Sequence, residues 1–304
     1  MSNRSVYILL LGASIFCQAL FSGAPAAARS LLDQAGRQVE VPERPQRIVA
    51  LAPSVTEIIF ALGEEARLIG VTAHCDFPPE AARLPKVGSY VRLDLERIVG
   101  LRPDLCIAVK DGNPKAAVER LEALGVPVFA LDPRSVATVI RAILDLGVVL
   151  AVEPRAEALT AKMHSRIRQV TGRIAGITHR PRVFFQIGNA PIVSVGTHTF
   201  AHELIGLAGG VNVAAGPAAY PRFSREQLLG LAPEVIVISS MDRTAGSAEQ
   251  TRQEWSRWRN VPAVRDGRIH LVDSDIFDRP SPRLVEGLDQ LAGFIHPHIF
   301  EGSE

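Results

Sequence analysis

The chain has 304 residues, of which 47% are hydrophobic, and its 33 Lys and Arg nearly balance its 32 Asp and Glu. This balance argues against a nucleic-acid-binding protein, which needs a basic excess. Three cysteines are too few for a disulfide framework, and a chain of this length buries a sufficient core without one.

Residues 1–28 have the order of a secretory signal peptide. Arg4 precedes an apolar run, and small residues lead up to Ala28. The run is shorter than the about 20 apolar residues that a membrane-spanning helix needs. We therefore predict secretion with cleavage after Ala28. A retained anchor or a lipid on Cys17 is the alternative, and Phe16 stands where a small residue should precede a lipid-modified cysteine.

Residues 29–152 are expected to form an N-terminal lobe in which strands alternate with helices. Ser54 is placed to cap the first helix, with Glu57 at the capping-box distance. The alternation favours a parallel sheet covered by helices. The strands are expected over 47–52, 68–71, 105–109 and 127–131.

Residues 153–177 break this alternation. Apolar residues recur at steps of three and four from Ala156 to Ile174, and Pro154 fits a first helical turn. About 22 helical residues span roughly 33 Å, enough to cross from one lobe to another. Two lobes joined by one rigid helix should move little against each other.

The alternation restarts with an expected strand over 182–187 and continues to another over 269–272, so residues 178–304 are expected to form a C-terminal lobe. The predicted fold class is α/β. It consists of two Rossmann-like lobes with central, mostly parallel sheets, joined by one long rigid helix.

One segment of the chain occurs twice. Residues 95–109 and 225–239 share Glu, Gly, Leu and Pro at matching positions, with an acid after each Pro. Each copy reads as a short helix, a turn and an apolar strand. The offset of 130 residues is the size of a domain. The repeat therefore indicates two similar lobes, which place a ligand between them.

The repeat also places one acid on each lobe. Glu96 and Glu226 each open a short helix, where the helix dipole favours a carboxylate. Capping leaves both side chains exposed at equivalent positions. A partner with two matching arginines could dock across both lobes through charge-assisted pairs.

Polar and aromatic residues lie in loops near the strand ends, where open α/β sheets bind ligands. Tyr90 and Tyr220 are again 130 residues apart, and two facing aromatic rings suit a large flat ligand. For any one such residue, a half-buried loop position is the alternative. The candidates from these loops are His74, Asp76, Phe77, Tyr90, Asn189, Tyr220, Asp275 and Arg279.

Motifs of catalysis are missing from the sequence. It has no G-x-S-x-G elbow, Walker loop or G-x-G-x-x-G. His202 and Glu203 begin like a zinc-protease helix, but Gly206 stands where the second His ligand is required. We expect His198 and His202 to be helix-start and packing residues, with metal or ligand contact as the alternative.

The two cysteines outside residues 1–28 are Cys75 and Cys106. They could pair in an oxidising compartment. Cys106 lies in an apolar strand run, where a buried free thiol is commoner, so we expect free thiols.

Five segments together carry a family resemblance. They are RIVALAPSVTE at 47–57, DFPP at 76–79, LERI at 95–98, SREQ at 224–227 and DIFDRPSPR at 275–283. These segments resemble the periplasmic vitamin B12-binding proteins of ABC importers. The wider group is the substrate-binding proteins with a helical backbone between lobes, which includes haem and ferric-siderophore binders.

The resemblance implies a monomeric periplasmic protein without a cofactor, whose cargo is a corrinoid such as cobalamin. It implies that Glu96 and Glu226 dock onto arginines of the ABC permease, which works with its ATPase. It also assigns the ligand contacts. His74, Tyr90, Val109 and Tyr220 stand where the family holds the corrin with aromatics, and Asp275 and Arg279 are its polar contacts.

The chain departs from this pattern at two positions. His74 replaces an expected Tyr and Val109 an expected Trp, so the aromatic clamp is reduced. His74 is a candidate axial ligand to the Co or Fe of a bound tetrapyrrole. Haem or ferric-siderophore binding therefore stays open, and a secreted metal-dependent hydrolase is the alternative from a different class.

Overall fold

The computed structural model describes residues 28–239 and 247–300. Within them, no helix is long and apolar enough to cross a membrane. The predicted signal peptide and Cys17 lie outside the described residues, apart from Ala28, which begins an N-terminal antiparallel hairpin. Its strands are β1 (Ala28–Leu32) and β2 (Gln38–Pro42).

The N-terminal lobe is built on a four-stranded parallel sheet of order β4-β3-β7-β8. The residues of β3, β7 and β8 are all buried because helices cover both faces, as is usual for parallel sheets. The strands are β3 (Ile48–Ala50), β4 (Leu68–Val71), β7 (Leu105–Val109) and β8 (Val128–Leu131). The helices are α1 (Pro53–Ala61), α2 (Leu95–Gly100), α3 (Lys115–Ala123) and α4 (Val136–Leu150). The short elements are η1 (Glu65–Arg67), η2 (Pro79–Arg83), β5 (Gly88–Ser89) and β6 (Arg92–Leu93).

The C-terminal lobe has a six-stranded mixed sheet of order β12-β10-β9-β13-β14, with β11 also paired to β9. Strands β11, β9, β13 and β14 are parallel, whereas β10 and β12 run antiparallel at one edge. The strands are β9 (Arg182–Gly188), β10 (Ile192–Ser194), β11 (Val211–Asn212), β12 (Arg222–Phe223), β13 (Val235–Ser239) and β14 (Ile269–Val272). The helices are α6 (Phe200–Leu207), α7 (Arg225–Leu231), α8 (Ser247–Trp255), α9 (Pro262–Arg265), α10 (Ser274–Phe277), α11 (Leu284–Ile295) and α12 (Pro297–Phe300).

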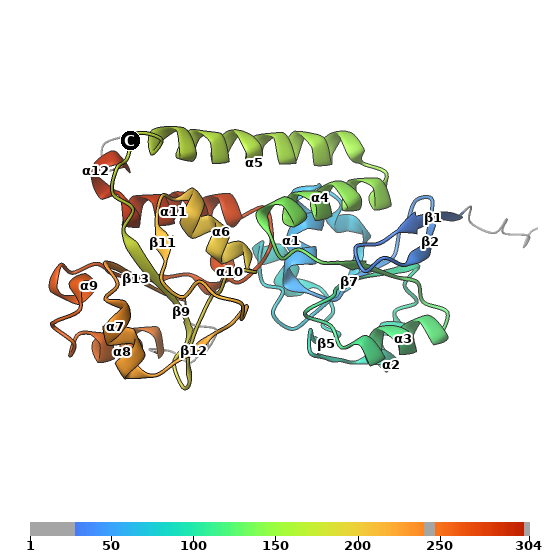
Figure 1. Ribbon diagram of the computed structural model, residues 1–304. Coiled ribbons are helices and arrows are strands. Elements are labelled where there is room, and N and C mark those ends of the chain that lie inside the picture. Colours follow the sequence, from blue (N-terminus) through green and yellow to red (C-terminus); the bar gives the residue numbers. More distant parts are fainter. Residues whose placement is uncertain (1–27, 240–246, 301–304) are drawn as a thin grey trace, which may run out of the picture.

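The predicted interlobe helix is confirmed as α5 (Glu153–Arg173), which has 21 residues and crosses the top of the molecule from one lobe to the other (Figure 1). It packs on α4 of the N-terminal lobe and on α6 and α11 of the C-terminal lobe. One hydrophobic cluster runs beneath it through both lobes, joining Ile143, Met163 and Leu288. The fold class is therefore confirmed, and the lobes share part of one core. We keep 29–152 and 178–304 as the proposed lobe boundaries.

Both copies of the repeat fold as a helix, a turn and a parallel strand, α2–β7 and α7–β13. Each turn contains a residue in the left-handed region, Arg102 (φ 49°) and Ala232 (φ 42°). The acid after each Pro accepts backbone hydrogen bonds at the start of a neighbouring strand, β3 in the first lobe and β9 in the second. Asp104 accepts hydrogen bonds from the backbone N–H groups of residues 46 and 47, and Glu234 accepts one from that of Arg182.

Two local expectations are resolved by the structure. Helix α1 begins after Ala52 without a side-chain cap, so the prediction that Ser54 caps it is wrong. Pro53 supplies the first turn instead, and Ser54 and Glu57 are buried. Cys75 and Cys106 are both free and buried, in separate hydrophobic clusters, which confirms free thiols.

Candidate functional site

A cleft of about 480 Å³ lies between the two lobes, on the side opposite α5. In the N-terminal lobe its walls are the loops that follow β3, β4, β7 and β8, together with Tyr90. These loops leave the carboxyl ends of parallel strands, where open α/β sheets bind ligands. The C-terminal lobe contributes the turn before α6, the loop before β12 and the segment after β14.

The cleft brings together six of the residues expected from the sequence. These are His74, Tyr90, Val109, Tyr220, Asp275 and Arg279. The other three lie nearby or elsewhere. Asp76 forms an ion pair with Arg279 at 2.8 Å, and the ring of Phe77 lies 3.9 Å below the Arg283 guanidinium. Asn189 is exposed in the turn between β9 and β10.

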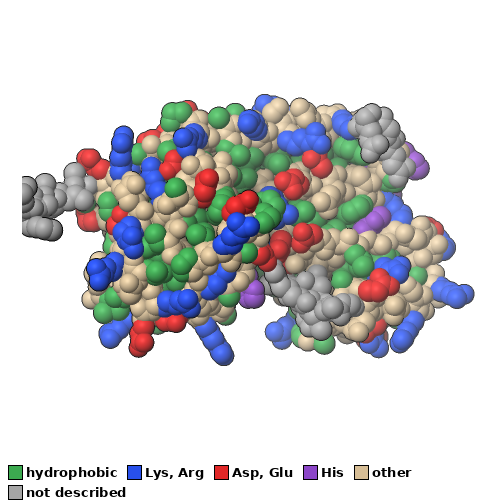
Figure 2. Space-filling model, turned by 180° about the vertical axis from the view of Figure 1, so that it is seen from behind, with side chains coloured by type: hydrophobic (Ala, Val, Ile, Leu, Met, Phe, Trp, Pro, Cys, Tyr) green, Lys and Arg blue, Asp and Glu red, His purple; other side chains and the backbone are tan. Residues whose placement is uncertain are grey.

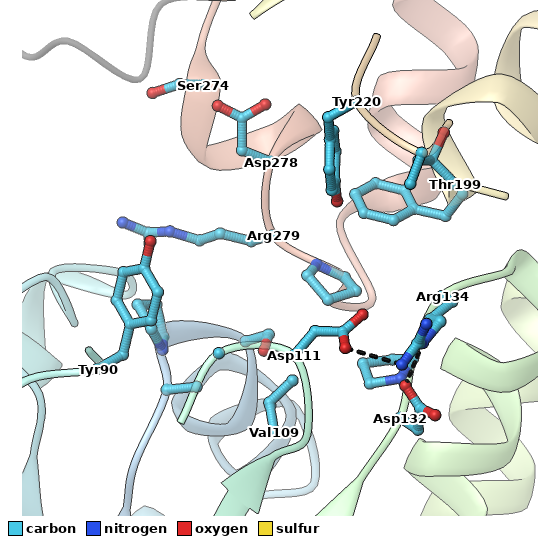
Figure 3. A pocket seen from close by; sticks show the side chains of 18 of the residues that line it. Tyr90, Val109, Asp111, Asp132, Arg134, Thr199, Tyr220, Ser274, Asp278 and Arg279 are labelled. Carbon is cyan, nitrogen blue, oxygen red and sulfur yellow. Dashed lines mark hydrogen bonds and ion pairs between the residues drawn. The ribbon is translucent and has the colours of Figure 1, made fainter. Parts of the chain in front are cut away.

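Tyr90 and Tyr220 point into the cleft from opposite lobes (Figure 3). Tyr90 is half-buried and its carbonyl accepts a hydrogen bond from Asn113 Nδ2 at 2.9 Å. Its ring lies against Gly112, where an added Cβ would come within 3.4 Å of it. Tyr220, by contrast, is 60% exposed. The loop that follows β7 therefore holds Tyr90, whereas solvent surrounds much of Tyr220.

An ion-pair cluster lies on the N-terminal wall of the cleft. Arg134 donates to Asp132 at 2.6 Å and to Asp111 at 2.7 Å, and Lys110 adds a pair to Asp132 at 3.2 Å. These contacts raise the pKa of Arg134, mainly through the hydrogen bond to Asp132. Arg134 and Asp111 are 50% and 59% exposed at their side chains, so a ligand can reach both.

Asp278 lies on the C-terminal wall, beside Tyr220 (Figure 3). The Ser239 hydroxyl, at the end of β13, donates to its carboxylate at 3.1 Å. Burial raises the pKa of Asp278 to about 7, and the neighbouring Asp275 adds to the shift. The carboxyl group therefore exchanges its proton near neutral pH.

Arg279 lies where the two lobes meet. Its guanidinium binds Glu57 at 2.9 Å and the carbonyl of His74 at 2.9 Å, both in the N-terminal lobe. It also binds Asp275 at 2.7 Å, and only 7% of the side chain is exposed. The side chain lines the cleft, but much of its hydrogen-bonding capacity is used within the protein.

The ionisable lining of the cleft is mainly acidic. Asp111, Asp132, Asp275 and Asp278 give four carboxyl groups, against the two guanidinium groups of Arg134 and Arg279. Seen from behind, acidic side chains gather where the two lobes meet (Figure 2). Because each arginine is already paired with carboxylates, the cleft repels anions more than it attracts them.

The histidines singled out by the sequence have separate positions. His74 and His198 are exposed and line the cleft, and α6 begins at Phe200, after His198. His202 is half-buried, with Nδ1 3.1 Å from Asn212 Nδ2. In the part of the chain that the structure describes, no group of three His, Cys, Asp or Glu could hold a metal ion.

Glu203, the acid of the incomplete zinc-protease motif, has a contact that the sequence did not indicate. Its carboxylate accepts a hydrogen bond of 2.7 Å from the backbone N–H of Val136, at the start of α4 in the other lobe. An acid is favoured at this end of a helix by the dipole. Glu203 therefore joins α6 to α4 across the two lobes.

Sequence reasoning missed the loop 132–134 and gave Asp278 no role of its own. The loop follows the predicted strand over 127–131, so the rule that polar residues after a strand line the site would have found Asp132 and Arg134. Asp278 lies in a segment already singled out, at 275–283. The contact of Glu57 with the other lobe had no sequence signal, because its partners are more than 200 residues away.

Outside the cleft, Glu96 on α2 and Glu226 on α7 are both exposed. Neither forms an ion pair with another described residue within 4.0 Å. The pKa of Glu226 is lowered, because its own backbone N–H and the Ser224 hydroxyl donate to the carboxylate. The side chain is therefore ionised at neutral pH and available to a basic partner.

Comparison with known proteins gives consistent matches over most of the chain. A family model described as "Periplasmic binding protein" matches residues 48–276. The vitamin B12-binding protein of Photorhabdus laumondii is 32% identical over 248 residues, covering 81% of this chain and 86% of the relative. That of Vibrio parahaemolyticus is 32% identical, covering 80% and 86%.

Solved structures match in the same way. The periplasmic vitamin B12 binding protein of Vibrio cholerae has a TM-score of 0.74 and 27% identity, covering 85% of this chain and 99% of the other. A periplasmic heme binding protein from Pseudomonas aeruginosa has a TM-score of 0.76 and 30% identity, covering 83% and 93%. Proteins with two different tetrapyrrole ligands are therefore similar to this chain over most of its length.

Proposed function

Because the chain belongs to the periplasmic binding protein family, we propose that it captures a corrinoid between its two lobes and delivers it to the permease of an ABC importer. Family membership confirms the resemblance drawn from the sequence motifs. The relatives named above are binding proteins, and we propose that this chain catalyses no reaction.

The charge of the cleft is the observation that carries this proposal. A corrin ring has amide side chains around its edge, and their N–H groups donate hydrogen bonds to carboxylates. Haem instead carries two propionates, which the cleft carboxyl groups, in excess of its two arginines, would repel. The acidic lining therefore favours the amide-edged ring. Tyr90 and Tyr220 supply rings for the flat face of the ligand.

The haem alternative rests on a different observation. His74 and His198 are exposed on the two sides of the cleft, and imidazole is a good ligand for iron and cobalt. The solved heme binding protein is similar over most of both chains. We retain His74 as a proposed axial ligand for either metal, and the acidic lining makes haem the second candidate.

Titration calorimetry of the chain from residue 29 onward, with cyanocobalamin and with hemin, tests the choice. We expect cyanocobalamin to bind below about 10 μM and hemin more weakly. The corrinoid proposal is wrong if hemin alone binds in this range. If neither ligand does, the tetrapyrrole assignment fails altogether.

A matched pair of variants tests the charge argument itself. Asp111→Asn/Asp278→Asn removes one cleft carboxylate from each lobe with little change of shape. We expect hemin to bind this variant about tenfold more tightly and cyanocobalamin to change less than about threefold. Glu119→Gln/Asp266→Asn removes one exposed acid from each lobe outside the cleft and should alter neither affinity. An unchanged hemin affinity in the cleft variant would remove charge as the basis of selection.

We propose further that Glu96 and Glu226 dock onto basic side chains of the permease, one on each lobe. Their exposure, their equivalent positions at the start of α2 and α7 and the lowered pKa of Glu226 support this proposal. A monomer with a cleaved signal peptide, acting in the periplasm beside the permease and its ATPase, completes the proposed arrangement.

A further inference from the structure

The two lobes meet in a buried ion-pair network at the edge of the cleft. Glu57, on α1, is 2% exposed at its side chain, and Arg279, in the segment after α10, is 7% exposed. Their side chains are 2.9 Å apart although 222 residues separate them in the chain. The contact therefore joins the N-terminal lobe to the C-terminal lobe directly.

Both oxygens of the Glu57 carboxylate bind groups of the other lobe. Oε1 accepts from Arg279, and Oε2 accepts from the Ser281 hydroxyl at 2.6 Å. Burial raises the pKa of Glu57, while the hydrogen bonds from Arg279 and Ser281 oppose the shift. Each carboxylate oxygen is therefore held by a buried donor of the other lobe, which fixes the position of Glu57 relative to Arg279 and Ser281.

Arg279 connects Glu57 to residues that line the cleft. Its second terminal nitrogen binds the carbonyl of His74 and the carboxylates of Asp76 and Asp275. His74 and Asp275 line the cleft on opposite lobes. The position of Arg279 therefore fixes one residue on each wall, and Glu57 lies behind it, away from the ligand.

The network and α5 connect the lobes at different places. Pro53 and Ser54 line the cleft, and Glu57 lies one turn further along the same helix. Helix α5 crosses the opposite side of the molecule (Figure 1). A hinge at α5 alone would let the cleft open, whereas a second connection beside the cleft resists that rotation.

We propose that Glu57, Arg279 and Ser281 form an interlobe clamp, in which Glu57 is a positioning residue that sets the width of the cleft through Arg279. The clamp gives the cleft its binding width before the ligand arrives. Affinity then depends on Glu57 although it does not contact the ligand, because less ordering remains to be done on binding. This inference goes beyond the proposed function and does not depend on which ligand is carried.

The test measures the distance between the lobes in the ligand-free protein. Spin labels on Lys115→Cys, in α3, and Arg257→Cys, after α8, report on one exposed site in each lobe. Cys75 and Cys106 are buried and free, so labelling conditions can spare them. We expect a single narrow distance distribution that cyanocobalamin leaves unchanged.

Glu57→Gln keeps the shape of the side chain and removes its charge. We expect the distance distribution of this variant to become about twofold broader, or to shift, in the absence of ligand. Glu64→Gln is the control, because Glu64 is also largely buried and ion-paired, at 2.7 Å to Arg67 and 2.8 Å to Arg155. Arg67 belongs to the N-terminal lobe, and Arg155 lies in the first turn of α5, at the end that packs on α4 of the same lobe, so the control should keep the narrow distribution.

Three results would overturn the clamp. The first is a folded Glu57→Gln variant whose distance distribution equals that of the parent. The second is a parent distribution that is broad without ligand and narrows on binding. The third is equal broadening in Glu64→Gln, which would indicate general loosening. If Glu57→Gln does not fold, Ser281→Ala removes one hydroxyl from the clamp and should still broaden the distribution, and no broadening there would also count against it.

Binding affinity connects the clamp to the ligand. Glu57→Gln should bind cyanocobalamin about tenfold more weakly, while Glu64→Gln should bind like the parent. If the parent binds no corrinoid, the proposed function fails, but the distance measurement still decides the clamp. If the distances change and the affinity does not, Glu57 joins the lobes without positioning the site, and the inference is wrong.

Discussion

The two copies of the repeat have the same backbone structure, but the loops that precede them hold Tyr90 and Tyr220 differently. Strands β7 and β13, the left-handed turns at Arg102 and Ala232, and the helix-opening acids lie 130 residues apart. Before the first copy, β6 pairs with β5 in a separate two-stranded sheet. Before the second copy, β12 pairs with β10 and becomes part of the main sheet. The loops carrying Tyr90 and Tyr220 are therefore anchored in different ways.

The repeat therefore preserves the helix, turn and strand, but not the loops that carry the residues proposed to contact the ligand. The helix–turn–strand unit is fixed by its own hydrogen bonds, whereas the preceding loop depends on what it packs against. Asn113 and Gly112 support Tyr90, and Tyr220 is left 60% exposed. Docking through the helix starts should therefore be symmetric between the lobes, and ligand contact should not.

Loss of both Glu96 and Glu226 should have the largest effect, a loss of uptake, and tests whether docking is symmetric between the lobes. We expect Glu96→Ala/Glu226→Ala to reduce uptake at least about 100-fold, since two charge-assisted contacts of about 1.5–3 kcal/mol each are lost. Corrinoid binding to the purified variant should be unchanged. Uptake by cells that carry the variant, beside calorimetry, measures both.

The single variants test whether the two lobes contribute equally to docking. If the two lobes dock equivalently, Glu96→Ala and Glu226→Ala should reduce uptake by similar factors, each less than the double variant does. Glu119→Ala, on the exposed face of α3, should transport like the parent. Full uptake by the double variant would contradict docking through these acids.

Asp278, on the C-terminal wall of the cleft, should make the free energy of unfolding depend on pH. Burial raises the pKa of Asp278 to about 7, from an ordinary value of 3.8. Between pH 4 and 7 the folded protein retains a proton that the unfolded chain has lost, so this group lowers the free energy of unfolding as pH rises. The contribution is complete below about pH 4 and is lost by pH 7, amounting to roughly 4 kcal/mol at 1.36 kcal/mol per pKa unit.

Urea unfolding from pH 4 to 8 of the parent and of Asp278→Asn measures this contribution. The amide does not titrate, so the stability of the parent relative to the variant should fall across the window. Asp111→Asn, which removes an exposed acid of the opposite wall, serves as the control for the loss of a cleft carboxylate. A difference that rises with pH would have the wrong sign for a buried acid with a raised pKa.

Tyr90 and Tyr220 should contribute unequally to ligand affinity, which directly tests the different anchoring of their loops. We expect Tyr90→Ala to weaken cyanocobalamin binding about tenfold and Tyr220→Ala about threefold, since an ordered aromatic loses less freedom when the ligand binds. Tyr90→Phe and Tyr220→Phe keep the rings and should stay close to the parent. Equal losses in the two alanine variants would mean that the loop anchoring does not matter.

Much of the fold follows from short-range signals. The apolar run of Leu105–Val109 and the three- and four-residue steps along α5 report their own secondary structure, so strand and helix could be placed from the sequence. The loops after the strands then had to lie at one edge of the sheet, which located His74 in the cleft. Val109 was assigned to the site by the family resemblance instead.

The rest depended on contacts between distant segments. Ser54 and Glu57 have the spacing of a capping box, yet Glu57 is drawn to Arg279 and Ser281, whose place across the cleft no local pattern reports. The same holds for Glu203, which reaches α4 of the other lobe. The partners of both acids lie in the other lobe, so local sequence patterns could not predict these contacts.

The left-handed turns should give the smallest effect and the closest comparison of the copies. A side chain in this region costs about 1–2 kcal/mol, and glycine avoids the cost while losing more freedom on folding. Arg102→Gly and Ala232→Gly should therefore each raise the free energy of unfolding by about 0.5 kcal/mol. Ala116→Gly, at an ordinary position of α3, should lower it by about as much. Because Arg102 and Ala232 differ in side chain but share a φ of 49° and 42°, equal gains would mean that the turn itself is equivalent in both lobes. A gain at only one turn would show that its surroundings, rather than its backbone, set the cost, as they do for the two tyrosine loops.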